Sequence, residues 1–298
     1  QRRDVFLPLA AAEERHAAHW EQLLRDAGVE PRTPRTPFRV RALCFLARYI
    51  GTEAGKPLML RTEAAEADRY QADARDITPF VTPNRSFYRI DTALETPQVA
   101  LDTWRLRVTG MVDGPLTFTY DDLLRRDLVE ADLTLTCVSN EVGGILAGNA
   151  RWLGVPLREL LREAGVDRRA DQIVGRSVDD YTCGFPTSVL HDDRTALVAL
   201  GMNGVPLPVE HGFPARLLVA GLYGYVSATK WLSEIELTRF DRFDQYWVPR
   251  GYASRAPIKT FSRIDTPRPL THTPAGHVAV AGVAWAQTRG ISKVEVRI

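Results

Sequence analysis

The stretch LTLTCVSN, residues 133–140, predicts a β-strand that ends at a cysteine. Leucine and threonine alternate over its first four positions, which is the period-2 pattern of a strand with one buried face. Cys137 ends this pattern, and Ser139 and Asn140 follow it. A thiol at the end of a strand, before polar residues, is placed to meet a ligand. The alternative on local grounds is a small apolar side chain that fills space in a core.

Further short elements lie on both sides of this stretch. The runs 104–108 (WRLRV) and 216–220 (RLLVA) are rich in apolar residues and predict strands. The runs 120–126 and 156–164 have the spacing of short amphipathic helices. Strands and helices mixed in this way predict an α+β fold.

The first part of the chain has a different pattern. Apolar residues recur at three- and four-residue steps from residue 1 to 28, and two more helical patterns follow. After Asp76 the chain becomes rich in Pro, Gly, Thr and Val. We therefore expect a helical segment over 1–75, an α+β domain over 76–268, and the start of a β domain over 269–298.

The C-terminal part predicts two strands. Residues 277–286 and 291–298 both alternate, and residues 287–290 join them as a turn. The second pattern continues to the last residue, and residue 1 stands inside a helical pattern. We therefore expect both ends of the chain to be cut edges of larger domains.

Composition excludes several classes of protein. The 298 residues are 45% hydrophobic and 25% charged, which is typical of a globular protein with a real core. Thirty-eight basic against 37 acidic residues leave a net charge of +1, so no global field favours nucleic acid. The three cysteines form neither a disulfide framework nor a zinc pattern, and no apolar run is long enough to span a membrane.

Two other segments carry polar residues in patterns that suit a ligand. The first is PNRSFYRID, residues 83–91, a loop of aromatic and charged residues before a predicted strand. The second begins with HGFPAR at 211–216 and continues to Thr229 and Lys230. Its cationic donors, set around glycine turns, suit a phosphate or an oxygen-rich heterocycle. A solvated surface loop is the alternative for each segment.

Five separated motifs occur in one order along the chain. They are FYR at 87–89, TWRLRVTG at 103–110, LTCVSN at 135–140, HGFPARL at 211–217 and TKWL at 229–232. Together they resemble the molybdopterin-binding domain of the sulfite oxidase family, over roughly residues 80–265. Residues 277–298 are similar to the start of the immunoglobulin-like dimerisation domain that follows in that family.

The resemblance implies a cofactor and the residues that hold it. The family binds one molybdenum through a pyranopterin dithiolene and a single protein thiolate, and the matching position is Cys137. A soft sulfur ligand suits a redox metal. Asp91 stands where eukaryotic members carry His. The positions that match the cofactor-binding residues of the family are Asn84, Phe87, Tyr88, Arg89, Asp91, His211, Arg216, Thr229 and Lys230.

The chain differs from the family at the positions that bind the substrate. Sulfite oxidases place two arginines just after the cysteine ligand, whereas Asn140 and Glu141 stand here. Glu141 would repel an anion, so sulfite is doubtful, and a neutral S-oxide or another oxo compound is the alternative. Arg89 remains as a cationic contact, and it joins Cys137 as a candidate catalytic residue.

The N-terminal segment carries a motif of its own. Glu13 and His16 form a Glu-x-x-His pair, and the segment resembles part of a ferritin-like, rubrerythrin-type domain. A di-iron site of that kind takes ligands from four helices. At most three helices are predicted here, so we do not expect iron.

The resulting expectation is a molybdenum-cofactor oxidoreductase that transfers an oxo group to or from a small-molecule substrate. The chain contains no haem-binding CxxCH motif, so electrons pass to or from a separate protein. One alternative is a degenerate scaffold that binds partners without catalysis. Another is a hydrolase that uses Cys137 with His211, although no third orienting residue stands out. Relatives of this fold are often exported or membrane-tethered, and the sequence leaves location and oligomeric state open.

Overall fold

The computed structural model describes residues 77–141, 143–268, 270, 272, 280–287 and 289–297. The predicted helical segment, with Glu13 and His16, lies outside these residues. The described part contains two compact units. One holds 79–262 and 284–297, and the other holds Ile77, Thr78 and the described residues of 263–283.

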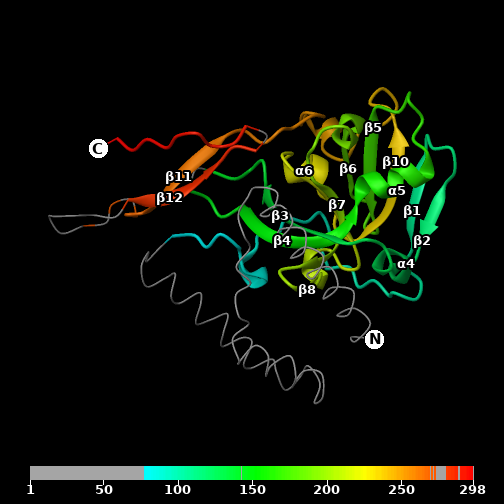
Figure 1. Ribbon diagram of the computed structural model, residues 1–298, viewed down its shortest axis with the longest axis horizontal. Coiled ribbons are helices and arrows are strands. Elements are labelled where there is room, and N and C mark those ends of the chain that lie inside the picture. Colours follow the sequence, from blue (N-terminus) through cyan, green and yellow to red (C-terminus); the bar gives the residue numbers. More distant parts are fainter. Residues whose placement is uncertain are drawn as a thin grey trace, which may run out of the picture. The chain divides into compact units, whose positions relative to one another are not determined.

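The first sheet contains five strands in the order β2-β1-β10-β5-β6 (Figure 1). β1 and β10 run parallel, and the other neighbours run antiparallel. The parallel pair brings together strands that are more than a hundred residues apart in sequence. The strands are β1 (Leu106–Gly110), β2 (Leu116–Phe118), β5 (Gln172–Ser177), β6 (Thr182–Pro186) and β10 (Leu232–Thr238).

The second sheet is entirely antiparallel. Its order is β3-β4-β7-β8, and β9 pairs with β7 beside that path. β3 ends at Thr136, so the strand predicted before Cys137 is confirmed. The strands are β3 (Val129–Thr136), β4 (Ala147–Pro156), β7 (Ala196–Met202), β8 (Val205–Pro206) and β9 (Arg216–Val219).

Short helices connect the two sheets. α5 (Leu157–Ala164) contacts β4 and β7 of the second sheet and β1 of the first. It buries residues at three- and four-residue steps, as its sequence predicts. α6 (Gly224–Ser227) contacts β6 and β9, again one strand of each sheet. The other helices are α4 (Tyr120–Leu124) and the 3-10 helices η1 (Asn84–Ser86), η2 (Thr187–Leu190), η3 (Val209–His211) and η4 (Val248–Arg250).

The buried apolar side chains form two clusters. The larger one lies around the first sheet and α5, and Leu106, Ile173 and Leu237 are fully buried in it. The smaller one lies against the second sheet around Trp152. Phe87 belongs to this smaller cluster, so the segment predicted to bind a cofactor is anchored in the core.

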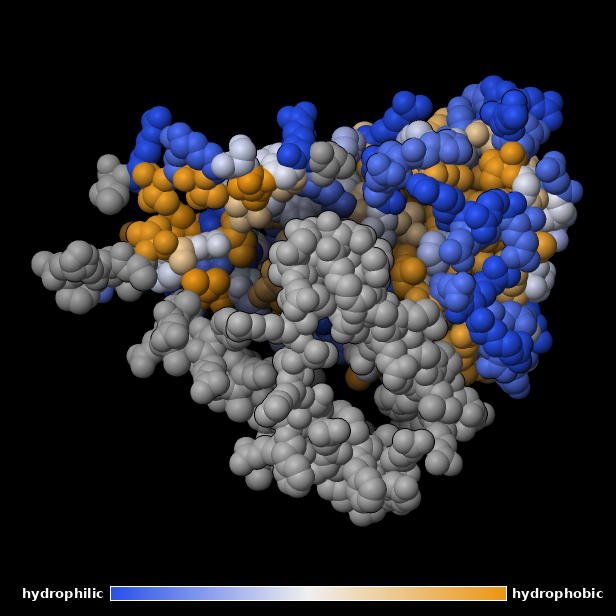
Figure 2. All heavy atoms as spheres, in the orientation of Figure 1, coloured by the Kyte–Doolittle hydropathy of each residue, from blue (hydrophilic) through white to orange (hydrophobic). Residues whose placement is uncertain are grey.

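The C-terminal strands differ from the prediction. β12 (Ala281–Trp285) pairs with β11 (Phe261–Thr266), not with residues 291–297, which form no strand. Phe261 stacks on Trp285 at 5.6 Å between ring centroids. Alternation predicts strands in both 277–286 and 291–298. Which strands pair depends on the apolar side chains that meet across the ladder. Figure 2 shows hydrophobic side chains gathered over these two strands, where Ile264 is 56% exposed.

The α+β fold class predicted from the sequence is confirmed. The described elements are short helices and mixed sheets, with more strand than helix. In the described ranges we find no helix with the length and apolar character needed to cross a bilayer.

Candidate active site

A pocket of about 200 Å³ opens where β3 ends. Five residues singled out in the sequence line it, and they come from three distant segments of the chain. Those five are Tyr88, Asp91, Cys137, Arg216 and Lys230.

Cys137 lies at the pocket with its thiol free and half-buried. The turn after β3 holds its backbone, because the Cys137 amide donates to Leu146 O at 2.9 Å and its carbonyl accepts from Asn140 N at 3.1 Å. The Asn140 side chain accepts from Leu146 N at 2.8 Å. The strand and this hydrogen-bonded turn together fix the sulfur at the pocket wall.

Arg216 is a buried cation at the start of β9. Its Nη1 donates to His211 O at 3.2 Å, while its Nε has no hydrogen-bond partner. No carboxylate among the described residues pairs with it. Burial lowers the pKa of Arg216 to about 10, so it stays charged at neutral pH. A desolvated guanidinium of this kind favours an anion or a strong hydrogen-bond acceptor in the pocket.

Lys230 is the second cationic side chain that lines the pocket. Its ammonium contacts the Asp91 carboxylate and donates to Glu210 O at 3.1 Å. Burial and the positive charge of Arg89 lower the pKa of Lys230, and the Asp91 carboxylate opposes this shift. A Cβ at Gly212, where φ is +112°, would lie 2.9 Å from Lys230 Cα, so only glycine lets this turn approach the lysine so closely.

Tyr88 adds a neutral donor to the pocket. Burial raises the pKa of its hydroxyl, so the proton stays on oxygen. Its ring stacks on Phe87 at 5.3 Å between centroids. Phe87 itself is buried and meets the edges of Trp152 and His211, so it positions Tyr88 and does not line the pocket.

Four further predicted residues lie outside the pocket lining: Asn84, Arg89, His211 and Thr229. His211 is buried, and its Nε2 donates to Asn84 O at 2.8 Å while its Nδ1 has no partner. Thr229 is fully buried, with its hydroxyl 2.9 Å from Cys183 Sγ. Arg89 is half-exposed, and its guanidinium donates to Thr96 Oγ1 at 3.2 Å. These predicted residues are therefore not part of the pocket wall.

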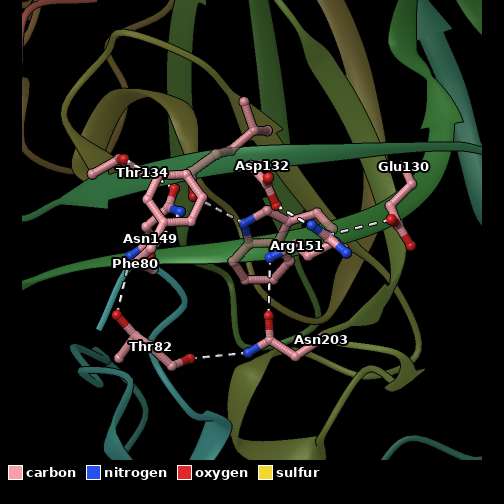
Figure 3. A network of polar contacts seen from close by, with 10 residues as sticks. Phe80, Thr82, Glu130, Asp132, Thr134, Asn149, Arg151 and Asn203 are labelled. Carbon is pink, nitrogen blue, oxygen red and sulfur yellow. Dashed lines mark hydrogen bonds and ion pairs between the residues drawn. The ribbon is translucent and has the colours of Figure 1, made fainter. Parts of the chain in front are cut away.

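A polar network fixes the segment that carries Asn84 (Figure 3). Asn203 donates to Thr82 O at 2.9 Å and to Asn84 Oδ1 at 2.7 Å, and it accepts from Arg151 N at 2.9 Å. Asn149 of β4 donates to Phe80 O at 3.0 Å. The network attaches residues 80–84 to the second sheet, directly before the residues that enter the pocket.

Glu141 is exposed and does not line the pocket. The repulsion of anions expected from it therefore has no direct geometric basis. No group of three or more metal-ligating side chains occurs within the described ranges. A metal at this pocket would take Cys137 as a single protein ligand.

One side of the pocket contains residues that were not predicted as site residues. Tyr181, Tyr225, Trp247 and Tyr252 line it, together with Ser177 and Asp179. The signal was a run of aromatic residues at positions 240, 243, 246, 247 and 252. Such a run is ordinary in a core, and only the fold brings it to the pocket.

Comparison with known proteins gives consistent matches. Residues 93–247 match the family model described as the oxidoreductase molybdopterin binding domain. The mitochondrial sulfite oxidase of Rattus norvegicus is 28% identical over 259 residues, which cover 73% of this chain and 47% of that protein. The uncharacterized oxidoreductase YuiH of Bacillus subtilis is 31% identical over 182 residues, which cover 59% of this chain and 87% of that protein.

A solved structure agrees with these matches. The sulfane dehydrogenase SoxCD from Paracoccus pantotrophus has a TM-score of 0.50 and 26% identity, covering 58% of this chain and 50% of that one. The chain thus spans about half the length of the mammalian relative and of the solved structure. The resemblance to the sulfite oxidase family seen in five sequence motifs is confirmed.

Proposed function

Because this chain belongs to the family with an oxidoreductase molybdopterin binding domain, we propose that it is an oxidoreductase with a single molybdenum bound to molybdopterin. One observation carries the proposal. A free thiol and a buried guanidinium whose Nε has no hydrogen-bond partner line one pocket in the described part of the chain.

The residues present fit this cofactor. One buried polar atom of a pocket-lining residue, Arg216 Nε, has no hydrogen-bond partner within the described structure. The phosphate of the cofactor offers the acceptor that this N–H needs. Cys137 supplies the soft sulfur ligand that a redox metal prefers.

Each residue then has a role. Cys137 holds the metal, and Arg216 with Lys230 holds the anionic end of the cofactor. Tyr88 keeps its proton and donates a hydrogen bond from the pocket wall. His211 and Asn84 keep the two cofactor-binding segments together. When bound, the cofactor supplies two-electron redox chemistry and the site at which an oxo group is exchanged.

The substrate is a small molecule, and an S-oxide or another uncharged oxo compound suits the pocket better than sulfite. Both predicted pocket cations already have a role in holding the cofactor, and Arg89 points to Thr96 and lies outside the lining. A separate electron-transfer protein would deliver or remove the electrons.

The hydrolase alternative finds no support in this geometry. His211 Nε2 is occupied by the Asn84 carbonyl, and His211 is absent from the pocket lining that contains Cys137. A thiol without an adjacent base lacks the activation that nucleophilic catalysis needs. The buried N–H of Arg216 Nε, which has no partner among the described residues, also argues against a scaffold that has lost its ligand.

The test is metal and pterin content after expression in a host that makes the cofactor. We expect near-stoichiometric molybdenum and pterin in the wild type and the same pterin with no oxo-transfer activity in Cys137→Ser. Cys183→Ala is the matched control, because this thiol is buried behind Thr229 and should not affect metal binding. Wild-type protein without molybdenum and pterin would refute the proposal.

A further inference from the structure

Four aromatic residues form one continuous side of the pocket: Tyr181, Tyr225, Trp247 and Tyr252. We call this side the aromatic wall. The Trp247 and Tyr252 rings are 4.9 Å apart, and the Tyr225 and Tyr252 rings are 5.4 Å apart, both between centroids. Tyr246 contacts both Tyr181 and Trp247 from outside the pocket, at 5.6 Å and 5.2 Å. The rings therefore support one another as a rigid surface.

The hydroxyl groups of two of these tyrosines are already used inside the protein. Tyr181 donates to Tyr225 O at 2.9 Å, and Tyr225 donates to Ala253 O at 2.9 Å. With their protons committed to backbone carbonyls, both residues offer mainly ring carbon to the pocket. A ligand in the pocket would thus touch mainly apolar ring carbon of the wall, although the wall contains three phenol groups.

The aromatic wall and the cofactor residues differ in burial. Arg216 and Lys230 are 7% and 9% exposed, whereas Tyr252 is 38% exposed. Trp247 is half-buried. The pocket thus holds the aromatic wall, the half-buried Cys137 and the cofactor residues together.

The charges around the wall disfavour an anion. The acidic residue beside it is Asp179, whose Oδ1 is buried without a hydrogen-bond partner among the described residues. The cations that line the pocket are Arg216 and Lys230, and both are assigned to the cofactor. A small inorganic oxoanion would gain little from ring carbon and would lie close to this carboxylate.

We propose that the aromatic wall binds the organic group of the substrate, and that the substrate is an uncharged S-oxide carrying an aromatic ring. This inference rests on the proposed function. Aromatic rings pair edge-to-face or offset-stacked with gains beyond their buried area. Transfer of the oxo group from such a compound breaks its sulfur–oxygen bond, takes two electrons from the electron-transfer protein and two protons from solvent, and leaves a sulfide and water.

The experiment compares two probes on the cofactor-loaded protein, methyl phenyl sulfoxide and dimethyl sulfoxide, by calorimetric titration. We expect wild type to bind the phenyl compound about tenfold more tightly, the size of one or two aromatic contacts. Trp247→Leu should reduce this preference to about twofold, and Tyr252→Leu, at a more exposed position, should reduce it too. Phe80→Leu is the control, because Phe80 is 74% exposed and outside the pocket, and it should keep the preference.

Two results would overturn the inference. One is equal binding of both sulfoxides by wild type. The other is loss of pterin from Trp247→Leu with an unchanged preference, which would mean that the wall holds the cofactor. Molybdenum and pterin are measured on the same samples. Their absence from wild type would refute the proposed function, and a persisting preference for the phenyl compound would still support the aromatic wall.

Discussion

The Nε2 atom of His211 lies 2.8 Å from the carbonyl oxygen of Asn84. This bond joins two segments that are 127 residues apart in sequence, and both segments end in residues that line the pocket. It leaves His211 Nδ1 buried and without a partner in the described structure. The imidazole therefore serves as a structural link on one side and offers a free ring nitrogen on the other.

The first prediction concerns pH. Burial lowers the pKa of His211 below its usual value, against the opposing effect of the Asn84 carbonyl. The folded protein thus favours neutral imidazole, and the unfolded chain binds more protons below the ordinary histidine pKa of about 6.5. The free energy of unfolding should be unaffected by His211 above that pH and should fall as the pH drops below it.

Urea unfolding of cofactor-free protein between pH 7.5 and 5 tests this. His211→Gln keeps a side-chain N–H for the Asn84 carbonyl but does not titrate, so its stability should decline less steeply on acidification than that of wild type. His191 is exposed, so His191→Gln is the control. Parallel declines in wild type and His211→Gln would contradict the prediction.

The second prediction concerns Arg216. Removing a buried charge without a counter-ion relieves its desolvation cost, so Arg216→Met should raise the unfolding free energy of cofactor-free protein by about 1–3 kcal/mol. The same change should lower pterin content after expression with the cofactor. Stability and cofactor retention thus move in opposite directions, which a merely structural arginine would not produce.

Arg107 provides the matched control for that variant. It pairs with Glu234 at 2.8 Å on the surface, and its side chain is 57% exposed. Arg107→Met should change the unfolding free energy by less than about 1 kcal/mol and leave pterin content unaltered. Destabilisation of Arg216→Met would show that the guanidinium is satisfied without a ligand.

The third prediction concerns the Asp91–Lys230 contact. Both side chains are largely buried, with 17% and 10% exposed. Asp91→Asn leaves the ammonium without its carboxylate and should cost about 1–3 kcal/mol of unfolding free energy. Adding Lys230→Met should restore part of that loss, because the uncompensated charge is then gone. Strictly additive effects in this double-mutant cycle would mean that the two residues do not interact.

The fourth prediction concerns Asn203, which adopts the left-handed conformation at φ 52°. Asn203→Ala loses three hydrogen bonds and strains the backbone, so it should cost about 2–4 kcal/mol. Asn203→Gly loses the same bonds without the strain, so it should cost about 1 kcal/mol less. Both should lower pterin retention, because the network in Figure 3 holds the segment that leads to Tyr88. Denaturant unfolding and pterin assays measure the two effects.

Local features of the chain were predictable because a few neighbouring residues encode them. Alternation up to Thr136 predicted the end of β3 and the position of Cys137 after it. Apolar spacing predicted α5, since Leu157, Leu160, Leu161 and Ala164 share one helix face. The cofactor family followed from five separated motifs and agrees with the family model that matches residues 93–247.

Which side chains face the pocket depended on contacts between distant segments. Nothing local distinguishes Arg216, which lines the pocket, from His211, which turns to Asn84 behind it. The same holds for the pairing of β12 with β11, which alternation alone placed with the last residues of the chain. Local periodicity specifies elements and one buried face. Which elements pair with one another depends on packing between remote residues. The same packing forms the aromatic wall, to which η4 and its neighbours contribute.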